Sequence, residues 1–258
     1  MTVSATTRIS IAIEPPVARI TLDNPPLNVI DIPMMEELSV ALTEIDTRTD
    51  VSTIVFGAKG KAFSAGVDVA AHTPEKINTM LEKFHGVIKA LVATRKVTIA
   101  AVHGACLGGG AELAVVCDIV FTSRDASWGF PEIKLGCYPP VACTALAALI
   151  GQKKATELIL TGRTISGDEA VAIGLANKSA ITDEVPALVD ETLEYLKCLS
   201  PVALSVTKKA IYAWDSMHFD KGLARAEKVY LEELMNTEDA AEGIRAFIEK
   251  REPRWRAR

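Results

Sequence analysis

The sequence predicts an α/β fold, and two observations lead to that prediction. Short runs of β-branched residues alternate with segments of helical periodicity in the first half; beyond about Pro139 helical patterns follow one another while the strand signal fades. Strands separated by helices favour parallel pairing in a layered core. A chain of 258 residues, 49% of them hydrophobic, can bury such a core, which excludes a disordered or fibrous protein.

The strands and helices of the first half are predicted from residue type and spacing. The predicted strands are 8–13, 18–22, 52–56, 97–102 and 119–122. The clearest helix covers 75–94, where apolar residues from Ile77 to Leu91 recur at i, i+3, i+4 and i+7. An earlier helix begins after Asp31, a residue type favoured at the N-cap, with Pro33 in its first turn.

The second half is predicted to be mainly helical and to pack on the α/β core. Its helical patterns cover 145–160, 168–172, 184–199, 201–214 and 221–250. We therefore divide the chain into an α/β core, 1–199, and a C-terminal helical region, 200–258. The helical region would form a second layer or an assembly surface.

Composition excludes several classes of protein. With 28 basic and 33 acidic residues the net charge is −5, so there is no general positive field to attract nucleic acid. The odd number of cysteines and their spacing indicate neither a disulfide framework nor a metal site, and we interpret them as reduced core thiols. The N-terminus has no apolar signal region and no segment reaches the ~20 apolar residues of a membrane span, so we expect a cytoplasmic protein.

The most informative stretch is 103–112, HGACLGGGAE, which runs from a predicted strand through three glycines into an apolar helical pattern. Such glycines fit a backbone that approaches a ligand closely or adopts positive φ, with free N–H groups at the helix start. A tight strand-to-helix packing turn explains the glycines equally well. The spacing matches neither a P-loop nor a dinucleotide fingerprint.

Two acids among apolar neighbours are candidate catalytic groups. Glu112 follows the glycines, where it could also simply compensate the helix dipole, and Glu132 lies in WGFPEIKLG, where it could be an ordinary surface acid. Two carboxyls in one poorly solvated pocket would have raised and split pKa values, so that one acts as base and the other as acid. Sequence alone does not bring them together.

A second glycine turn lies upstream, in KGKAFSAGVD, after the strand 52–56. One N–H from each glycine turn, aimed at the same oxygen, would form an oxyanion hole for an enolate. For Asp68, a capping role is favoured over a catalytic one.

These motifs, in this order, resemble the crotonase (enoyl-CoA hydratase/isomerase) superfamily over nearly the whole chain. The resemblance rests on FSAGVD, IAAVHGACLGGGAE, CDIVF, FPEIKLG and LTGRTIS. It implies a spiral of ββα turns, a helical C-terminal trimerisation region, and assembly as a homotrimer or a dimer of trimers. The substrate would be an acyl-CoA thioester, with no separate cofactor and no metal.

The resemblance also assigns roles to individual residues. Glu112 and Glu132 match the two glutamates of the hydratases, so that keeping both favours addition or removal of water. Val67 and Gly109 would supply the oxyanion-hole N–H groups. The residues implied to bind coenzyme A or substrate are Ser64, Ala65, Gly66, Asp68 and Gly108.

The sequence departs from the common hydratase pattern after Leu135, where GCYPPVA replaces the usual PGAGG. Two prolines stiffen this turn and remove N–H donors, so the acyl pocket should differ from that of a simple short-chain enzyme. This segment, with SAGVDVAAHTP and FHGV, is most similar to cyclohexa-1,5-diene-1-carbonyl-CoA hydratases of anaerobic aromatic degradation.

Alternatives remain open at this point. The chain could be a general short-chain enoyl-CoA hydratase or another isomerase or hydrolase of the superfamily; a non-enzymatic RNA-binding role is opposed by the acidic charge. His72 and His85 could line the acyl pocket, although a structural role is favoured. The acyl group, the roles of Tyr138 and the histidines, and the acid and base assignment stay open.

Overall fold

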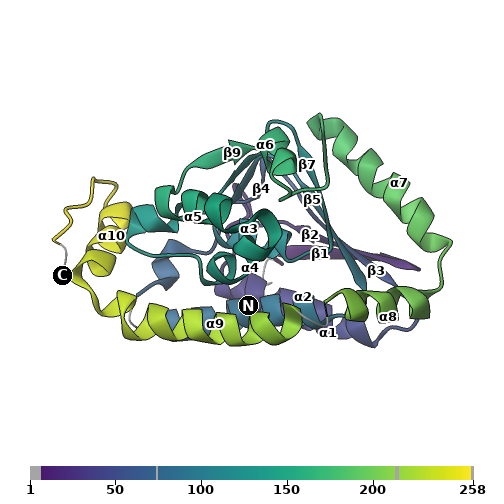
Figure 1. Cartoon of the computed structure of the whole chain (residues 1–258), viewed down its shortest axis with the longest axis horizontal. Helices are drawn as coiled ribbons and strands as arrows, with labels where there is room; N and C mark the ends of the chain where they lie inside the picture. The colour runs from purple at the N-terminus through teal and green to yellow at the C-terminus, as the bar shows by residue number, and fades with distance from the viewer. Residues whose placement is uncertain (1–6, 74, 213–214, 257–258) are drawn as a thin grey trace, which may run out of the picture.

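The computed structural model describes residues 7–73, 75–212 and 215–256 (Figure 1). The strands are β1 (Ile9–Glu14), β2 (Val17–Leu22), β3 (Thr53–Ala58), β4 (Ala62–Ser64), β5 (Val97–Val102), β6 (Ala105–Leu107), β7 (Ile119–Ser123), β8 (Ser127–Gly129), β9 (Thr164–Ser166) and β10 (Lys178–Ala180). The α-helices are α1 (Ile32–Thr47), α2 (Ile77–Ala93), α3 (Gly109–Val115), α4 (Pro140–Ile150), α5 (Gln152–Thr161), α6 (Gly167–Ala172), α7 (Val185–Lys197), α8 (Pro201–Ile211), α9 (Asp215–Glu232) and α10 (Glu238–Ile248).

The strands of the described chain form two sheets that grow together as a spiral. The larger sheet has the order β1-β2-β3-β5-β7-β10 and the smaller one β4-β6-β8-β9. Each turn of the spiral places one strand in the larger sheet and the next in the smaller one, as β3-β4, β5-β6 and β7-β8 do. The pairs β3·β5, β5·β7, β4·β6 and β6·β8 are all parallel. The α/β class and the spiral of ββα turns are confirmed.

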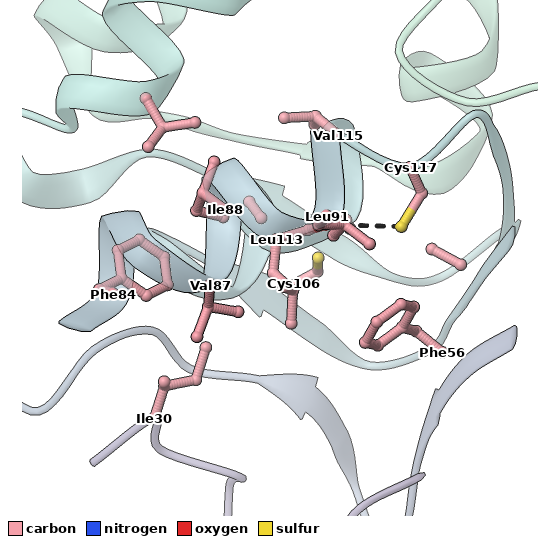
Figure 2. Close-up of a cluster of buried hydrophobic side chains, with 14 of the residues drawn as sticks. Ile30, Phe56, Phe84, Val87, Ile88, Leu91, Cys106, Leu113, Val115 and Cys117 are labelled. Carbon is pink, nitrogen blue, oxygen red and sulfur yellow. Dashed lines mark hydrogen bonds between the residues drawn. The ribbon is translucent and has the colours of Figure 1, made fainter. Parts of the chain in front are cut away.

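Helices α1 and α2 form as their sequence patterns predict. The Asp31 side chain accepts a hydrogen bond from Met34 N at 3.0 Å, which caps α1 with Pro33 inside its first turn. Figure 2 shows how α2 contributes to the core, with Phe84 and Ile88 packed in one cluster with Leu113 and Val115 of α3. This packing holds α2 against the helix that follows the glycines.

A separate apolar layer covers the other face of the larger sheet. Helix α7 packs Val185, Val189 and Leu193 on the sheet residues Ile99 and Phe121. In Figure 1, α7 crosses this face while α9 runs along the opposite side of the molecule toward α10. The larger core cluster lies on the opposite face of this sheet, where α1, α2 and α3 supply most of its helical residues.

Several predicted boundaries are wrong. The predicted helix 145–160 is two helices separated at Gly151, whose φ of 79° breaks the helix, and the pattern 221–250 is interrupted by a 3₁₀ turn at Leu234–Asn236. Strands β9 and β10 lie beyond the point where the strand signal fades, because three-residue strands show no periodicity. Residues 213–214, in the predicted helix 201–214, lie outside the described residues.

The cysteines are all free, but the interpretation of core thiols holds for only part of them. Cys106, Cys117 and Cys137 are buried, whereas Cys143 and Cys198 are exposed. Among the described residues, no helix is both long and apolar enough to cross a membrane. The cytoplasmic location and the division at residue 199 stay predictions.

Candidate active site

Two glycine turns from neighbouring ββα units meet at one point. Val67 follows β4, and Gly109 begins α3 directly after β6, the parallel partner of β4. A Cβ atom placed on Gly109 would lie 3.4 Å from Val67 N and 2.5 Å from Val67 Cγ2, so the two backbones are in close approach. Among the described residues, neither the Val67 N–H nor the Gly109 N–H donates a hydrogen bond to another group. Two unpaired donors side by side can bind an oxyanion.

The glycines are required by this close approach. Gly108 has a φ of 50°, and a Cβ there would lie 2.6 Å from Glu132 Oε1. Gly110 is similarly confined, since a Cβ there would lie 2.5 Å from Ser64 Cβ. The simple packing turn that the sequence left open therefore explains part of the motif, while Gly108 is needed to admit a carboxyl group.

Glu112 is buried in the first turn of α3, and its side chain contacts the start of α4. Its side-chain Oε1 accepts a hydrogen bond from Ala142 N at 2.9 Å. That N–H lies in the first turn of α4, where backbone donors have no partner within the helix. Burial raises the pKa of Glu112 to about 7, although the hydrogen bonds from Ala142 and Val141 lower it. The GCYPPVA turn thus still provides a donor, because the helix places Ala142 beyond the two prolines.

Glu132 lies in the 3₁₀ helix Pro131–Leu135, which follows β8. Its Oε2 is buried and has no hydrogen-bond partner among the described residues. Burial, followed by the nearby charge of Glu112, raises the pKa of Glu132 to about 8. A carboxyl with its pKa raised in this way keeps its proton near neutral pH.

The two glutamates line one small cavity of about 80 Å³ together with Val67 and Gly109. The other cavity-lining residues come mainly from the glycine turns, α2, the GCYPPVA turn and α9. They are Ala65, Gly66, Val69, His72, Met80, Leu81, Phe84, His85, Gly108, Pro131, Leu135, Cys137, Tyr138, Pro139, Pro140 and Tyr230. The contribution of α9 was not predicted, because Tyr230 carries no sequence signal that separates it from an ordinary core aromatic. Tyr138 anchors α9 by donating its hydroxyl to Ala226 O at 2.6 Å.

The loop implied to hold coenzyme A is built partly by its own hydrogen bonds. Ser64 is fully buried, and its hydroxyl donates to Asn28 O at 2.7 Å and accepts from Gly66 N at 3.1 Å. Asp68 accepts from Ala70 N at 3.0 Å, which is the favoured capping role. Ala65, Gly66 and Gly108 line the cavity. Coenzyme A binding by these five residues stays a prediction.

A second, larger cavity lies between α4, α5 and the helices α8 and α9. It has a volume of about 750 Å³ and mostly apolar walls that include Leu149 and Val229. Its charged wall contains Asp118 and Lys208, whose Oδ2 and Nζ atoms lie 2.8 Å apart. We refer to it below as the apolar groove.

No group of three or more His, Cys, Asp or Glu side chains in the described ranges is arranged to hold a metal ion. The expected absence of a metal or a separate cofactor stays a prediction. His72 Nδ1 donates a hydrogen bond to the backbone carbonyl oxygen of Asp68 at 3.1 Å, and burial lowers the pKa of His72.

Comparison with known proteins agrees with this geometry. Residues 12–258 match the family model described as enoyl-CoA hydratase/isomerase. The chain is 36% identical to a "Probable enoyl-CoA hydratase" of Bacillus subtilis, covering 96% of this chain and 98% of the relative. It is 34% identical to the "Cyclohexa-1,5-dienecarbonyl-CoA hydratase" of Thauera aromatica, covering 93% of each chain.

Solved structures show the same fold. An enoyl-CoA hydratase from Mycobacterium avium subsp. paratuberculosis superposes with a TM-score of 0.87 at 25% identity, covering 96% of this chain and 98% of that one. An enoyl-CoA hydratase from Bacillus anthracis gives 0.78 at 30% identity, with coverages of 97% and 100%. The chain therefore belongs to the enoyl-CoA hydratase/isomerase (crotonase) family and is an enzyme of the hydro-lyase type.

Proposed function

We propose that this cavity adds water to a conjugated acyl-CoA thioester, with Glu112 and Glu132 as the acid/base pair and the N–H groups of Val67 and Gly109 as the oxyanion hole. The observation that supports this most directly is that two buried carboxyls with pKa values raised to about 7 and about 8 line one cavity with two unpaired N–H donors. At neutral pH such a pair retains about one proton between its two groups.

The reaction follows from this proton count. Water held between the carboxyls loses a proton to the ionised one as its oxygen attacks the carbon β to the thioester. The electron pair moves to the carbonyl oxygen, where the Val67 and Gly109 N–H groups stabilise it. The protonated carboxyl then supplies the proton that completes the addition, and the proton removed from water restores the pair.

For the acyl group we propose a cyclic diene, cyclohexa-1,5-diene-1-carbonyl-CoA, hydrated to 6-hydroxycyclohex-1-ene-1-carbonyl-CoA in aromatic degradation. The similarity to the Thauera aromatica enzyme and the stiff Pro139-Pro140 turn support this substrate. With a conjugated ring, the enolate extends over the second double bond, so that protonation at the far end gives 1,4-addition.

The cavity volume favours a second candidate, a short linear enoyl-CoA. A dry cavity of about 150 Å³ holds benzene in another protein, whereas this one measures about 80 Å³. A ring would therefore require Tyr138 or α9 to move. The chain is also 34% identical to a "Short-chain-enoyl-CoA hydratase" of Clostridium acetobutylicum.

The experiment that decides between them offers the purified protein crotonyl-CoA and cyclohexa-1,5-diene-1-carbonyl-CoA side by side. Loss of conjugated-thioester absorbance and product analysis give kcat/KM for each. A preference for the diene supports the ring substrate, and a preference for crotonyl-CoA replaces it with the short-chain one. Hydration of neither, or products of isomerisation or thioester hydrolysis, would refute the hydratase proposal.

We further propose assembly as a homotrimer or a dimer of trimers through the C-terminal helices. Helix α8 exposes Val202, Val206 and Ile211 at 72%, 61% and 66%, an apolar surface that an interface would cover. Light scattering should show three or six chains for the wild type and fewer for Val202→Glu/Val206→Glu. A monomeric wild type would contradict this proposal.

A further inference from the structure

The cavity contains a polar pair that the hydration mechanism does not use. His85 of α2 has a side chain that is 1% exposed and lines the cavity together with both glutamates. Its Nδ1 lies 2.5 Å from Oε1 of Glu227, a residue of α9. Lys89 Nζ lies 3.7 Å from the same carboxylate oxygen. Two helices distant in sequence thus fix the orientation of this imidazole ring.

The second ring nitrogen of His85 has no such partner. Its Nε2 is buried and makes no hydrogen bond within the described residues. Within the described residues, the buried side-chain polar atoms without a hydrogen-bond partner are His85 Nε2, Glu132 Oε2 and Ser123 Oγ. Of these residues, His85 and Glu132 line the same cavity. Leaving such an atom unpaired costs about 1–3 kcal/mol, so the cavity is built to receive a polar group at each of the two positions.

The hydrogen bond to Glu227 determines what His85 can bind. The carboxylate accepts the proton on Nδ1, and burial lowers the His85 pKa, which keeps the ring neutral even though Glu227 raises that pKa. In a neutral imidazole with its proton on Nδ1, Nε2 is an acceptor. Its ligand must therefore be a donor, such as an O–H group.

Helix α2 forms the wall of the cavity that carries His85, and its residue Phe84 approaches Gly109. Phe84, the neighbour of His85, has its ring carbon Cζ 3.1 Å from where a Cβ of Gly109 would lie. The same wall is otherwise apolar, with Met80 and Leu81 of α2 lining the cavity. An acyl chain whose carbonyl oxygen binds at Gly109 would thus meet one acceptor on a largely apolar wall.

We propose that His85 is a specificity-determining residue whose Nε2 accepts a hydrogen bond from a hydroxyl group on the acyl chain or ring of the substrate, with Glu227 as the residue that positions it. The proposal rests on the proposed function, because it assumes that the acyl group occupies this cavity. It keeps the proposed hydration chemistry but makes the preferred substrate an enoyl-CoA thioester, linear or cyclic, that carries a hydroxyl beyond the β carbon, in place of the unsubstituted diene or crotonyl-CoA.

The test compares trans-4-hydroxybut-2-enoyl-CoA with crotonyl-CoA, which differ by one hydroxyl. We expect the wild type to favour the hydroxylated substrate at least tenfold in kcat/KM, because a site built to bond a substrate hydroxyl discriminates strongly against the analogue that lacks it. His85→Phe should reduce this ratio to about one. His103→Phe, whose ring bonds Gly60 O away from the cavity, is the matched control and should keep the wild-type ratio.

Variants of the positioning residue separate a specific role from a structural one. Glu227→Gln retains an oxygen that can accept the Nδ1 proton, so it should preserve most of the ratio, whereas Glu227→Leu should lose it. If His85→Phe does not fold, the ratio of kcat/KM measured for Glu227→Leu decides the test. A wild-type ratio below tenfold, or one that these changes leave intact, overturns the proposal.

The same two ligands distinguish failure of this inference from failure of the hydratase proposal. If the wild type hydrates neither of these two nor the cyclic diene, the proposed function fails, and the dissociation constants of the two ligands become measurable at equilibrium by calorimetry. A tenfold tighter binding of the hydroxylated ligand that His85→Phe abolishes would still support the role of His85. Equal binding, or none, would overturn it.

Discussion

Two pairs of ionisable side chains, Asp118 with Lys208 and Glu112 with Glu132, differ in two ways. The first combines an acid with a base and the second two acids, and the first has more of its hydrogen bonds made within the protein. In the apolar groove, Asp118 Oδ2 lies 2.8 Å from Lys208 Nζ and also accepts from Thr98 N at 2.7 Å and Thr98 Oγ1 at 3.0 Å. In the small cavity, two carboxyl groups, those of Glu112 and Glu132, share a site, and one carboxyl oxygen has no partner within the described residues. An opposite-charge pair with hydrogen-bond partners is satisfied within the fold and is costly to break, whereas two adjacent carboxyls with raised pKa values and an unpaired oxygen are typical of a functional site.

The comparison also explains why the larger cavity is not the candidate active site. The apolar groove measures about 750 Å³ against about 80 Å³ for the cavity with the glutamates. Among the described residues that line it, Asp118 and Lys208 already neutralise each other, and the remaining charged residue, Arg225, adds no second acid. The volume of a cavity alone therefore does not identify an active site. A pair of titratable groups with shifted pKa values is better evidence for one.

The largest expected effect is on turnover when the like-charged pair is broken. Glu112→Gln and Glu132→Gln each remove one proton-transferring group, so kcat/KM for the preferred enoyl-CoA should fall about 10²–10⁴-fold. Spectrophotometric hydration assays measure this loss. Glu157→Gln, at an exposed acid paired with Arg163, is the matched control and should stay within about twofold. Full activity of Glu132→Gln would refute the mechanism.

A change in the oxyanion hole should have the next largest effect. In Gly109→Ala the new Cβ would lie 2.5 Å from Val67 Cγ2 and 3.1 Å from Phe84 Cζ, so the two N–H donors must move apart. We expect kcat to fall about 10²-fold, with KM changed less, because a shift near 1 Å at the reacting oxygen costs about that much. The control is Gly86→Ala in α2, where nothing lies within 4 Å of the added Cβ. Equal kcat for both variants would refute the role of Gly109.

Much of this arrangement could be predicted from the sequence, for identifiable reasons. The helix from Ile77 shows a full apolar stripe, and the ordered motifs give the family and hence Glu112, Glu132 and Gly109. The three-residue strands β4, β6 and β8 could not be predicted by periodicity, since they are shorter than any pattern. Their pairing nevertheless brings the two glycine turns together.

The contributions of distant residues could not be predicted at all. His85 and Glu227 are 142 positions apart, and only the docking of α9 on α2 joins them. The Ala142 N–H that bonds Glu112 is likewise a property of where α4 begins, which the prediction placed later in the chain. Tertiary packing decides such contacts, and a local sequence pattern carries no information about it.

The opposite-charge pair should affect stability without affecting catalysis. Lys208→Met removes one partner and leaves Asp118 charged near the groove, although Thr98 still donates to it. We expect the free energy of unfolding to fall by about 2 kcal/mol, less than for a fully buried pair because Asp118 keeps 14% exposure. Urea unfolding at matched protein concentration measures it. A more than tenfold loss of kcat/KM in a folded variant would show that the groove takes part in turnover.

The last effect is a gain in stability from removing the titrating carboxyl of Glu132, and its size depends on pH. Folding raises the pKa of Glu132 from its usual value near 4.5 to about 8, so the folded state binds more protons than the unfolded state between these limits. Wild-type stability must therefore decrease as pH rises through this window. Because Glu132→Gln has no titrating group at this position, its stability should not show that decrease with pH.

Its advantage over the wild type should be near zero at pH 4.5 and should grow by up to about 1.4 kcal/mol for each pH unit up to pH 8, since one pKa unit corresponds to that amount. Thermal melts across this range measure the difference, with Glu157→Gln as the exposed control that should show no such growth. A constant difference between Glu132→Gln and the wild type at all pH values would mean that Glu132 titrates normally. The like-charged pair would then lose the property that distinguishes it from Asp118 and Lys208.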